Sequence, residues 1–274
     1  MKSTYTFPNR SLLRRLLSTF LSLAMVLSLA CVTFAETVEE TKPEIVWDEN
    51  NETILLDYGA EYGEGEKSFQ LVVDHLNQVA VCTIHTDEET VGAALAALNI
   101  VAGEDSDYGL MVNTIDGYTA DYNVDGTYWA FYINDEYAMT GVDSTPVEEG
   151  AVYSFKVDGA QVEEGATISL VDGKHYGLGE KSFALVVTDG EGNEVSVTVH
   201  TNEETVGAAL AALNIVAGED SDFGLYVKTA NNVTADYDTD GKYWAFYIDD
   251  EYAMTGVDST EIQEGSTYSL KVEG

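Results

Sequence analysis

Apolar and polar side chains alternate along two neighbouring stretches of the chain, residues 68–75 and residues 80–86. Alternation with a period of two places the apolar side chains on one face of a β-strand. Because only a short polar turn separates the two stretches, they predict an antiparallel hairpin.

The hydrophobic period changes from two to that of a helix directly after this hairpin. Apolar residues then recur at positions i, i+3, i+4 and i+7, namely Val91, Ala94, Leu95 and Leu98. Thr86 and Glu89 have the spacing of a capping box, which predicts that the helix begins there. Gly103 is a candidate stop signal.

Two further hairpins and a final strand are predicted after the helix. Their strands are 110–114 with 118–122, 127–133 with 136–141, and the final strand 152–157. The central residues, Asp116-Gly117 and Asn134-Asp135, tolerate the positive φ of tight turns. We expect the Trp129 face of 127–133 to lie under the helix. The order of elements predicts an α+β fold of β-grasp type, a mostly antiparallel sheet with one covering helix.

The whole pattern occurs twice. The stretch that begins at His85 returns at His200 with few changes, and the match continues to Gly159 and Gly274. Each copy has the size of a domain, so we predict two tandem β-grasp-like domains. Their predicted boundaries are 46–159 and 160–274.

The charge of the chain excludes several classes of partner. It has 49 Asp and Glu against 12 Lys and Arg, for a net charge of -37, and Arg occurs only at positions 10, 14 and 15. A polyanion repels phosphate, and beyond residue 15 no Arg supplies the planar fork that binds phosphate bidentately. We therefore expect no nucleic-acid partner.

The first 35 residues have the pattern of an export signal. Basic residues precede an apolar run, and Thr33-Phe34-Ala35 offers a cleavage site. We predict a signal peptide over 1–35, an acidic tail over 36–45, and a chain that is secreted or held at the surface of a Gram-positive-type bacterium, without stable membrane insertion after cleavage. Two alternatives remain: lipidation at Cys31 and an uncleaved anchor.

A family resemblance depends on residues near the hairpin 127–141. Tyr128-Trp129, Gly141 and Gly150 return as Tyr243-Trp244, Gly256 and Gly265. In this order they resemble the transcobalamin C-terminal-like domain of bacterial surface proteins, a soluble-ligand-binding β-grasp family. The resemblance implies a small ligand such as a corrinoid, facing the hairpin after the Tyr-Trp pair. The large helical domain that forms the other wall in the cobalamin carriers is not found in this sequence.

The candidate ligand-binding residues combine this resemblance with the strand pattern. Aromatic rings with a polar atom on the open face suit a flat or neutral ligand, although tyrosine is also simply favoured in strands. The candidates are Tyr128, Tyr132, Tyr137, Met139, Thr140, Tyr243, Tyr247, Tyr252, Met254 and Thr255.

Two loops imitate the first half of a calcium-binding loop, with oxygen ligands at positions 1, 3 and 5 and glycine at position 6. The weak calcium candidates are Asp121, Asn123, Asp125, Asp236, Asp238 and Asp240. Position 12 is Tyr132 or Tyr247 rather than Glu, so a polar hairpin connection explains the loops better. We expect no resident cofactor or structural metal.

No combination of nucleophile, base and orienting acid is recognisable, and neither is a phosphate loop or a zinc spacing. We therefore expect no enzyme. Three function classes remain: a small-ligand-binding module, a protein or glycan interaction module of the cell surface, and a structural spacer.

Overall fold

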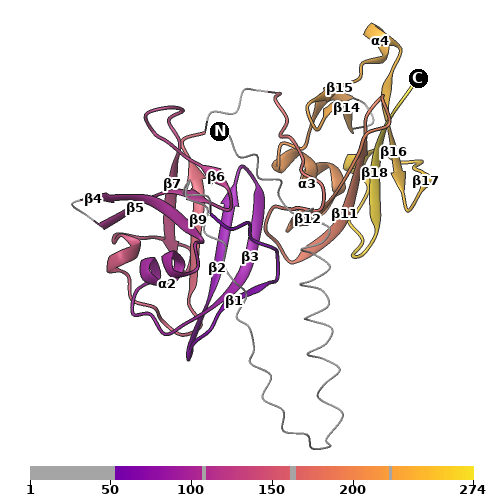
Figure 1. Ribbon diagram of the computed structural model, residues 1–274. Helices are drawn as coiled ribbons and strands as arrows, with labels where there is room; N and C mark the ends of the chain where they lie inside the picture. Colours follow the sequence, from indigo (N-terminus) through magenta and orange to yellow (C-terminus); the bar gives the residue numbers. More distant parts are fainter. Residues whose placement is uncertain (1–52, 107–108, 161–164, 222–223) are drawn as a thin grey trace, which may run out of the picture. The chain divides into compact units, whose positions relative to one another are not determined.

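A computed structural model describes residues 53–106, 109–160, 165–221 and 224–274 (Figure 1). The predicted signal peptide, the acidic tail and Cys31 lie outside the described residues. Contacts between residues divide the chain into two units, Met1–Val46 and Trp47–Gly274. Both repeats belong to the second unit. Within the described ranges, no helix is long and apolar enough to cross a membrane.

Repeat 1 consists of strands with one short helix. Its elements, in chain order, are β1 (Glu61–Gly63), β2 (Lys67–His75), β3 (Gln78–Thr86), α2 (Val91–Ala97), β4 (Val101–Ser106), β5 (Gly109–Ile115), β6 (Tyr118–Thr119), β7 (Tyr128–Ile133), β8 (Glu136–Tyr137), the 3-10 helix η2 (Val142–Ser144) and β9 (Val152–Asp158).

Repeat 2 has the same order, with one additional helical turn. Its elements are β10 (His175–Tyr176), β11 (Lys181–Thr188), β12 (Glu194–Thr201), α3 (Val206–Ala212), β13 (Val216–Ser221), β14 (Gly224–Ala230), β15 (Val233–Thr234), α4 (Tyr237–Asp240), β16 (Tyr243–Ile248), β17 (Glu251–Tyr252), the 3-10 helix η3 (Val257–Ser259) and β18 (Thr267–Glu273).

One mixed sheet of 12 strands runs through both repeats, in the order β17-β16-β18-β11-β12-β10-β3-β2-β9-β7-β8, with β1 beside β3. The strand β10 joins the repeats: it pairs in parallel with β12 and antiparallel with β3, where His175 lies opposite Val79 and Tyr176 opposite Gln78. Each repeat also has a small three-stranded sheet, β4-β5-β6 or β13-β14-β15.

The predicted α+β class is wrong. Of the described residues, 48 % lie in strands and 11 % in helices, and the strands form a large mixed sheet and two small ones rather than two α+β domains with covering helices. The helices α2 and α3 have seven residues each, so the apolar period of 91–98 marks only two turns. The strand pairing through β10 depends on two residues, which is too short for a periodic pattern to reveal.

The start and the end of the helix also differ from the prediction. Thr90, not Thr86, is the N-cap of α2, because its side chain accepts a hydrogen bond from Ala93 N. Thr86 instead accepts one from Glu88 N. Gly103 lies within β4 at an irregularity of the β4–β5 pairing, beyond the end of the helix.

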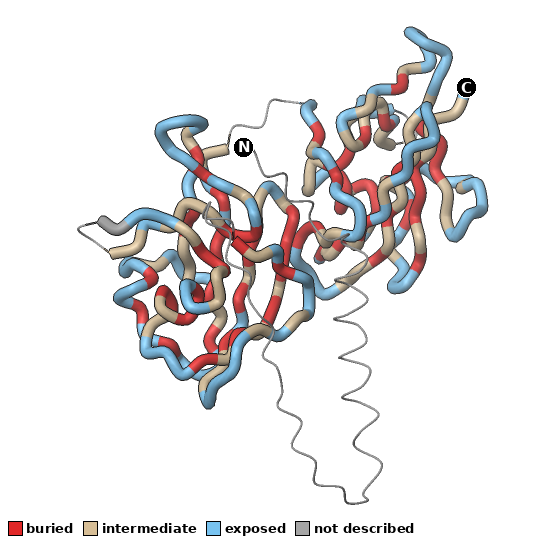
Figure 2. Tube along the Cα trace, in the orientation of Figure 1, coloured by how far each residue is buried: buried red, intermediate tan, exposed pale blue. Residues whose placement is uncertain are grey.

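Each repeat has its own cluster of buried side chains, contributed by the central strands and the short helix, and buried residues follow the strands in Figure 2. In repeat 1, Trp129 belongs to the same cluster of buried side chains as Val91 and Leu95 of α2. The predicted turns also form: Asp116 has a φ of 51° and Asn134 a φ of 48°.

Candidate functional site

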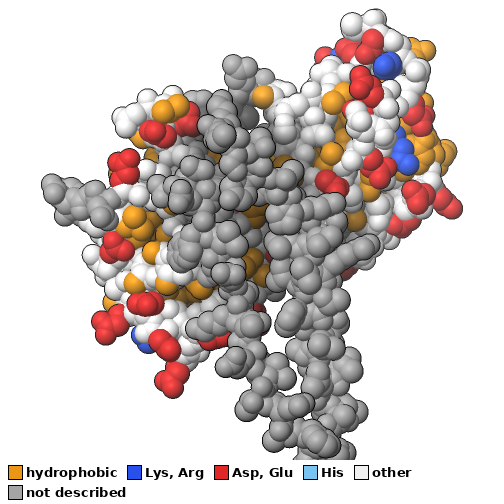
Figure 3. Space-filling view, viewed as in Figure 1, with side chains coloured by type: hydrophobic (Ala, Val, Ile, Leu, Met, Phe, Trp, Pro, Cys, Tyr) orange, Lys and Arg blue, Asp and Glu red, His pale blue; other side chains and the backbone are white. Residues whose placement is uncertain are grey.

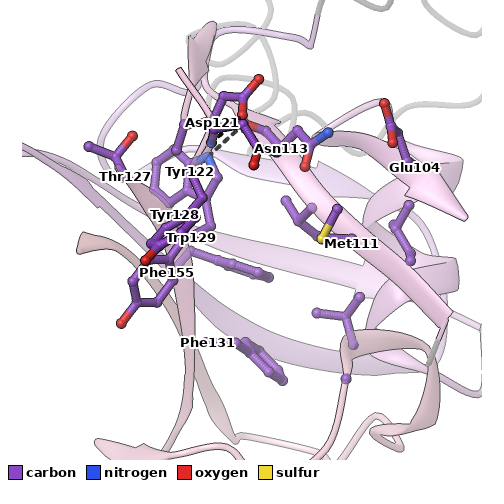
Figure 4. Close-up of a pocket in the computed structure, with 16 residues that line it drawn as sticks. Glu104, Met111, Asn113, Asp121, Tyr122, Thr127, Tyr128, Trp129, Phe131 and Phe155 are labelled. Atoms are coloured by element: carbon purple, nitrogen blue, oxygen red, sulfur yellow. Dashed lines mark hydrogen bonds between the residues drawn. The ribbon is translucent and has the colours of Figure 1, made fainter. Parts of the chain in front are cut away.

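A cavity of about 530 Å³ opens beside β7 in repeat 1 (Figure 4). Residues of β4 and β5, the connection 120–127 and the start of η2 enclose it together with β7 and β9. The lining side chains and backbone come from Glu104, Leu110, Met111, Val112, Asn113, Ala120, Asp121, Tyr122, Asn123, Thr127, Tyr128, Trp129, Phe131, Gly141, Val142 and Phe155.

Aromatic rings form the inner wall of the cavity. Trp129 and Phe155 are buried and Phe131 is half-buried, and the rings of Phe131 and Phe155 stack with centroids 5.0 Å apart. The indole of Trp129 donates a hydrogen bond to Asn113 O at 3.1 Å, which fixes the ring against β5. Such a wall offers apolar area and π faces to a ligand.

Polar groups gather at one rim. Figure 4 shows Asn113 between Asp121 and Glu104. Asp121 accepts a hydrogen bond from Asn123 N, and, among the described residues, neither Asp121 nor Glu104 has a cationic partner within ion-pair distance. The cavity thus combines an apolar wall with a negatively charged rim.

Of the predicted ligand-binding residues in repeat 1, only Tyr128 lines this cavity. Its hydroxyl donates to Asp158 Oδ2 at 3.0 Å, which raises the pKa of Tyr128. Tyr132 and Tyr137 lie outside the cavity, and their rings meet edge to face at 5.4 Å. Met139 follows Tyr137 and is 93 % exposed.

Repeat 2 repeats this exposed arrangement. Tyr247 and Tyr252 also meet edge to face, and Met254 is 94 % exposed. Tyr243 and Tyr247 both donate hydrogen bonds to Glu273, which raises the pKa of Tyr247 to about 12.

The two candidate threonines each pair with a threonine of the following loop. Thr140 Oγ1 lies 2.9 Å from Thr145 Oγ1, and Thr255 Oγ1 lies 2.9 Å from Thr260 Oγ1. Each of these pairs fixes the segment that leads into η2 or η3.

The weak calcium candidates serve their own loops. Asp121 accepts from Asn123 N, and Asp125 accepts from both the backbone and the hydroxyl of Thr127, which lowers the pKa of Asp125. In repeat 2, Asp236 caps α4 by accepting from Asp238 N, and Asp240 accepts from Lys242 N. No group of three or more His, Cys, Asp or Glu side chains that could hold a metal ion occurs in the part of the chain that the structure describes.

A family model matches residues 88–159 and 203–273, which together are about half of the chain. Its description is "Domain of unknown function (DUF4430)". The chain belongs to the DUF4430 family. The matches cover most of each repeat, from the approach to α2 or α3 up to β9 or β18. No curated protein matches this DUF4430 chain.

Two solved structures are similar to part of the DUF4430 chain. A protein from Ruminococcus gnavus ATCC 29149, provisionally assigned as metal binding, is 28 % identical, with 34 % of this chain and 97 % of that chain covered and a TM-score of 0.33. Haptocorrin in complex with Cbi is 19 % identical, with 34 % of this chain and 25 % of that chain covered and a TM-score of 0.27. The match thus spans about a quarter of the haptocorrin chain, and at these TM-scores neither likeness supports an argument.

The DUF4430 repeats meet at a cluster of rings that sequence reasoning missed. The Tyr58 ring of repeat 1 stacks on His175 at 4.2 Å and on His200 at 4.6 Å between centroids. His175 Nδ1 lies 2.8 Å from His200 Nε2. Burial, then the neighbouring His200, lowers the pKa of His175 to about 4, and burial lowers the pKa of His200.

A signal for this cluster exists in the alignment of the two repeats. The counterpart of His200 is His85, whose Nε2 lies 3.6 Å from Glu61 Oε2, and the counterpart of Glu61 is His175. A carboxylate–imidazole pair in repeat 1 is therefore a pair of imidazoles in repeat 2.

Proposed function

We propose that this DUF4430 chain is an exported, non-enzymatic binding module of a bacterial surface that takes a small organic ligand into the cavity of repeat 1. The cavity is the observation that carries the proposal. Its volume of about 530 Å³ lies within the range of roughly 300–1,000 Å³ that is usual for ligand pockets. Its aromatic inner wall and polar rim fit the same pattern.

The chemistry of the lining favours binding over catalysis. No His, Cys, Ser or Lys is among the lining residues. The lining hydroxyl of Thr127 donates to the Asp125 carboxylate, and this bond lowers the pKa of Asp125, so the carboxylate is a weak base. A site built this way holds a ligand but lacks a nucleophile with an activating partner.

The transcobalamin-like resemblance adds a ligand candidate to this proposal. If the chain shares the function of that family, a corrinoid or a part of one is the compound to test first. The hairpin residues Tyr137 to Thr140 implied by the resemblance do not line the cavity, whereas Tyr128 does. The resemblance therefore supports this cavity as the ligand-binding site only in part.

The test uses Trp129 and Trp244, two of the three tryptophans of the chain, as matched reporters within one molecule. The full chain is titrated with corrinoids and with a fragment library, and the indole N–H resonances of Trp129 and Trp244 are followed by NMR after assignment with Trp→Phe variants. We expect a ligand to shift the resonance of Trp129, whose indole lines the cavity, and to leave Trp244 unchanged. A ligand that raises the melting temperature but shifts neither indole would place binding elsewhere.

A second function is favoured by the exposed strands after β7 and β16. Tyr137 and Tyr252 are more than half exposed, and Met139 and Met254 almost fully so. We propose as the alternative that these two copies dock a surface protein or glycan, with avidity from the tandem arrangement. Replacement of both methionines with Ser should then abolish retention on cell-wall material without changing the melting temperature.

Export is the remaining part of the proposal, and it depends on the sequence of residues 1–35 alone. Mass spectrometry of the protein recovered from culture medium should find a chain that begins at Glu36. A diacylglyceryl group on Cys31 would instead show that the chain is a lipoprotein.

A further inference from the structure

The duplication supplies an internal comparison for the rim of the cavity. The counterparts of Glu104, Asn113 and Asp121, each 115 residues later, are Glu219, Lys228 and Asp236. Both carboxylates are therefore kept, and the residue between them changes from an amide to an ammonium. Repeat 2 thus shows what this rim looks like when a cation occupies it.

In repeat 2 the ammonium group of Lys228 bridges the two carboxylates. Its Nζ lies 2.9 Å from Glu219 Oε1 and 3.2 Å from Asp236 Oδ2. The Lys228 side chain is only 22 % exposed, so its alkyl stem lies against the protein. Hydrogen bonds to Glu219 and Asp236 raise the pKa of Lys228, and the bond from Lys228 lowers the pKa of Asp236.

In repeat 1 the shorter Asn113 brings no charge to this position. Glu104 and Asp121 remain on the rim without a described cationic partner, in a chain with a net charge of -37. Two carboxylates near one another favour a bound cation, because it relieves their repulsion. Beside them lies the cavity with its aromatic wall.

We infer that the ligand of the repeat 1 cavity is a small primary amine with an apolar or aromatic body, and this inference rests on the proposed function. Its ammonium group takes the place that Lys228 Nζ holds in repeat 2, between Glu104 and Asp121. Three N–H donors suffice for both carboxylates and the side-chain oxygen of Asn113. The apolar body then lies along Trp129 and Phe155, where burial and contact with the aromatic rings stabilise it.

An inorganic cation fits the same observations less well. It would neutralise the rim but leave the apolar wall of the cavity without a partner. No described group of three acidic or imidazole side chains is placed to coordinate a metal. The organic ammonium uses both halves of the site.

The experiment measures binding of phenethylamine to the full chain by calorimetry and by the Trp129 indole resonance, with phenylethanol as the neutral probe of matched shape. We expect the amine to bind about tenfold or more tightly than the alcohol, the effect of a charge-assisted hydrogen bond. Asn113→Lys reproduces the rim of repeat 2, so it should keep the melting temperature and lose amine binding.

Further variants separate charge from shape. The Glu104→Gln/Asp121→Asn double variant should bind the amine and the alcohol equally. Lys228→Asn is the matched change in repeat 2, and it should leave unchanged the amine affinity that is measured from the Trp129 resonance.

Three results would overturn the inference. Equal affinity of wild type for alcohol and amine would show that the cavity binds ligands without selecting an ammonium group, and the proposed function would stand. Unchanged amine binding by Asn113→Lys would show that the rim does not hold the amine. If neither probe binds, the inference is overturned. If corrinoids and the fragment library also leave the Trp129 resonance unchanged, the proposed function fails as well.

Discussion

The histidine pair at the junction of the repeats should make stability depend on pH. His175 is hydrogen-bonded to His200, and Tyr58 covers both rings. The charged groups that act on the pair are Lys174, which lowers the pKa of His175, Asp57, which raises it, and Glu264, which raises that of His200. Protonation of both rings would place two positive charges side by side and remove the acceptor of their hydrogen bond.

The size and sign of the effect follow from the pKa of His175. In the unfolded chain the imidazole has its ordinary pKa of 6.5, and in the folded chain the value is about 4. The unfolded state therefore takes up the proton first, so the contribution is fully present above pH 6.5 and is lost as the pH falls toward 4. This difference corresponds to about 3 kcal/mol, which solvent screening of a partly exposed ring reduces to about 1–2 kcal/mol.

The perturbation that tests this is His175→Asn, which removes the titrating group at the same position. Urea unfolding of wild type and variant is measured from pH 7.5 to pH 4.5. We expect the free energy of unfolding of the wild type to fall by about 1–2 kcal/mol more than that of the variant over this range. Contributions from the many carboxylates cancel, because both chains contain them.

An NMR titration of the wild type serves as a direct check on the assignment of the effect. The His175 ring should titrate near pH 4, and Tyr58→Ala, which uncovers the ring, should move its pKa upward. The reasoning is refuted if wild type and His175→Asn lose stability in parallel, or if His175 titrates with its ordinary pKa.

Three further predictions concern the core of repeat 1. Gly92→Ala should lower stability by about 1–3 kcal/mol even though Ala favours helices, because a Cβ would overlap the side chain and backbone of Asp143; a higher melting temperature would contradict this. Burial raises the pKa of Cys82 to about 12, so a Cys31→Ser chain should not react with a thiol reagent at pH 8 until urea unfolds it; rapid reaction in buffer would be the contrary result. Tyr153→Phe should cost about 1–3 kcal/mol in urea unfolding, because the buried hydroxyl both accepts and donates a backbone hydrogen bond; a loss below about 0.5 kcal/mol would show that water replaces it.

Local elements could be predicted from the sequence because each has its own short-range signal. Alternation identified the hairpin β2–β3, and Asp116-Gly117 and Asn134-Asp135 marked turns that have positive φ in the structure. The period of four apolar residues placed α2 correctly. Its N-cap was misplaced because Thr86 and Thr90 both precede acceptable helix starts, and only the bond from Ala93 N distinguishes them.

The fold class and the cavity could not be predicted in the same way. Periodicity says which face of a strand is apolar, but not that β10 would join two repeats into one sheet. The cavity is lined by residues of β4, β5, β7 and β9 together with the connection 120–127, so it arises from tertiary packing. One signal was available: Asn113 differs in charge from its counterpart Lys228, while the flanking carboxylates do not.

The junction through β10 joins the repeats head to tail, and such an interface can in principle continue into a filament. In repeat 1 the surface that β10 covers is Gln78 and Val79, both buried. The counterpart surface of repeat 2 is Asn193 and Glu194, which are exposed. Docking of another molecule's β1 at this edge would require burial of the Glu194 carboxylate where Val79 lies in the first junction. The difference between Val79 and its counterpart Glu194 therefore opposes the open-ended self-assembly into a filament that a head-to-tail junction would otherwise permit.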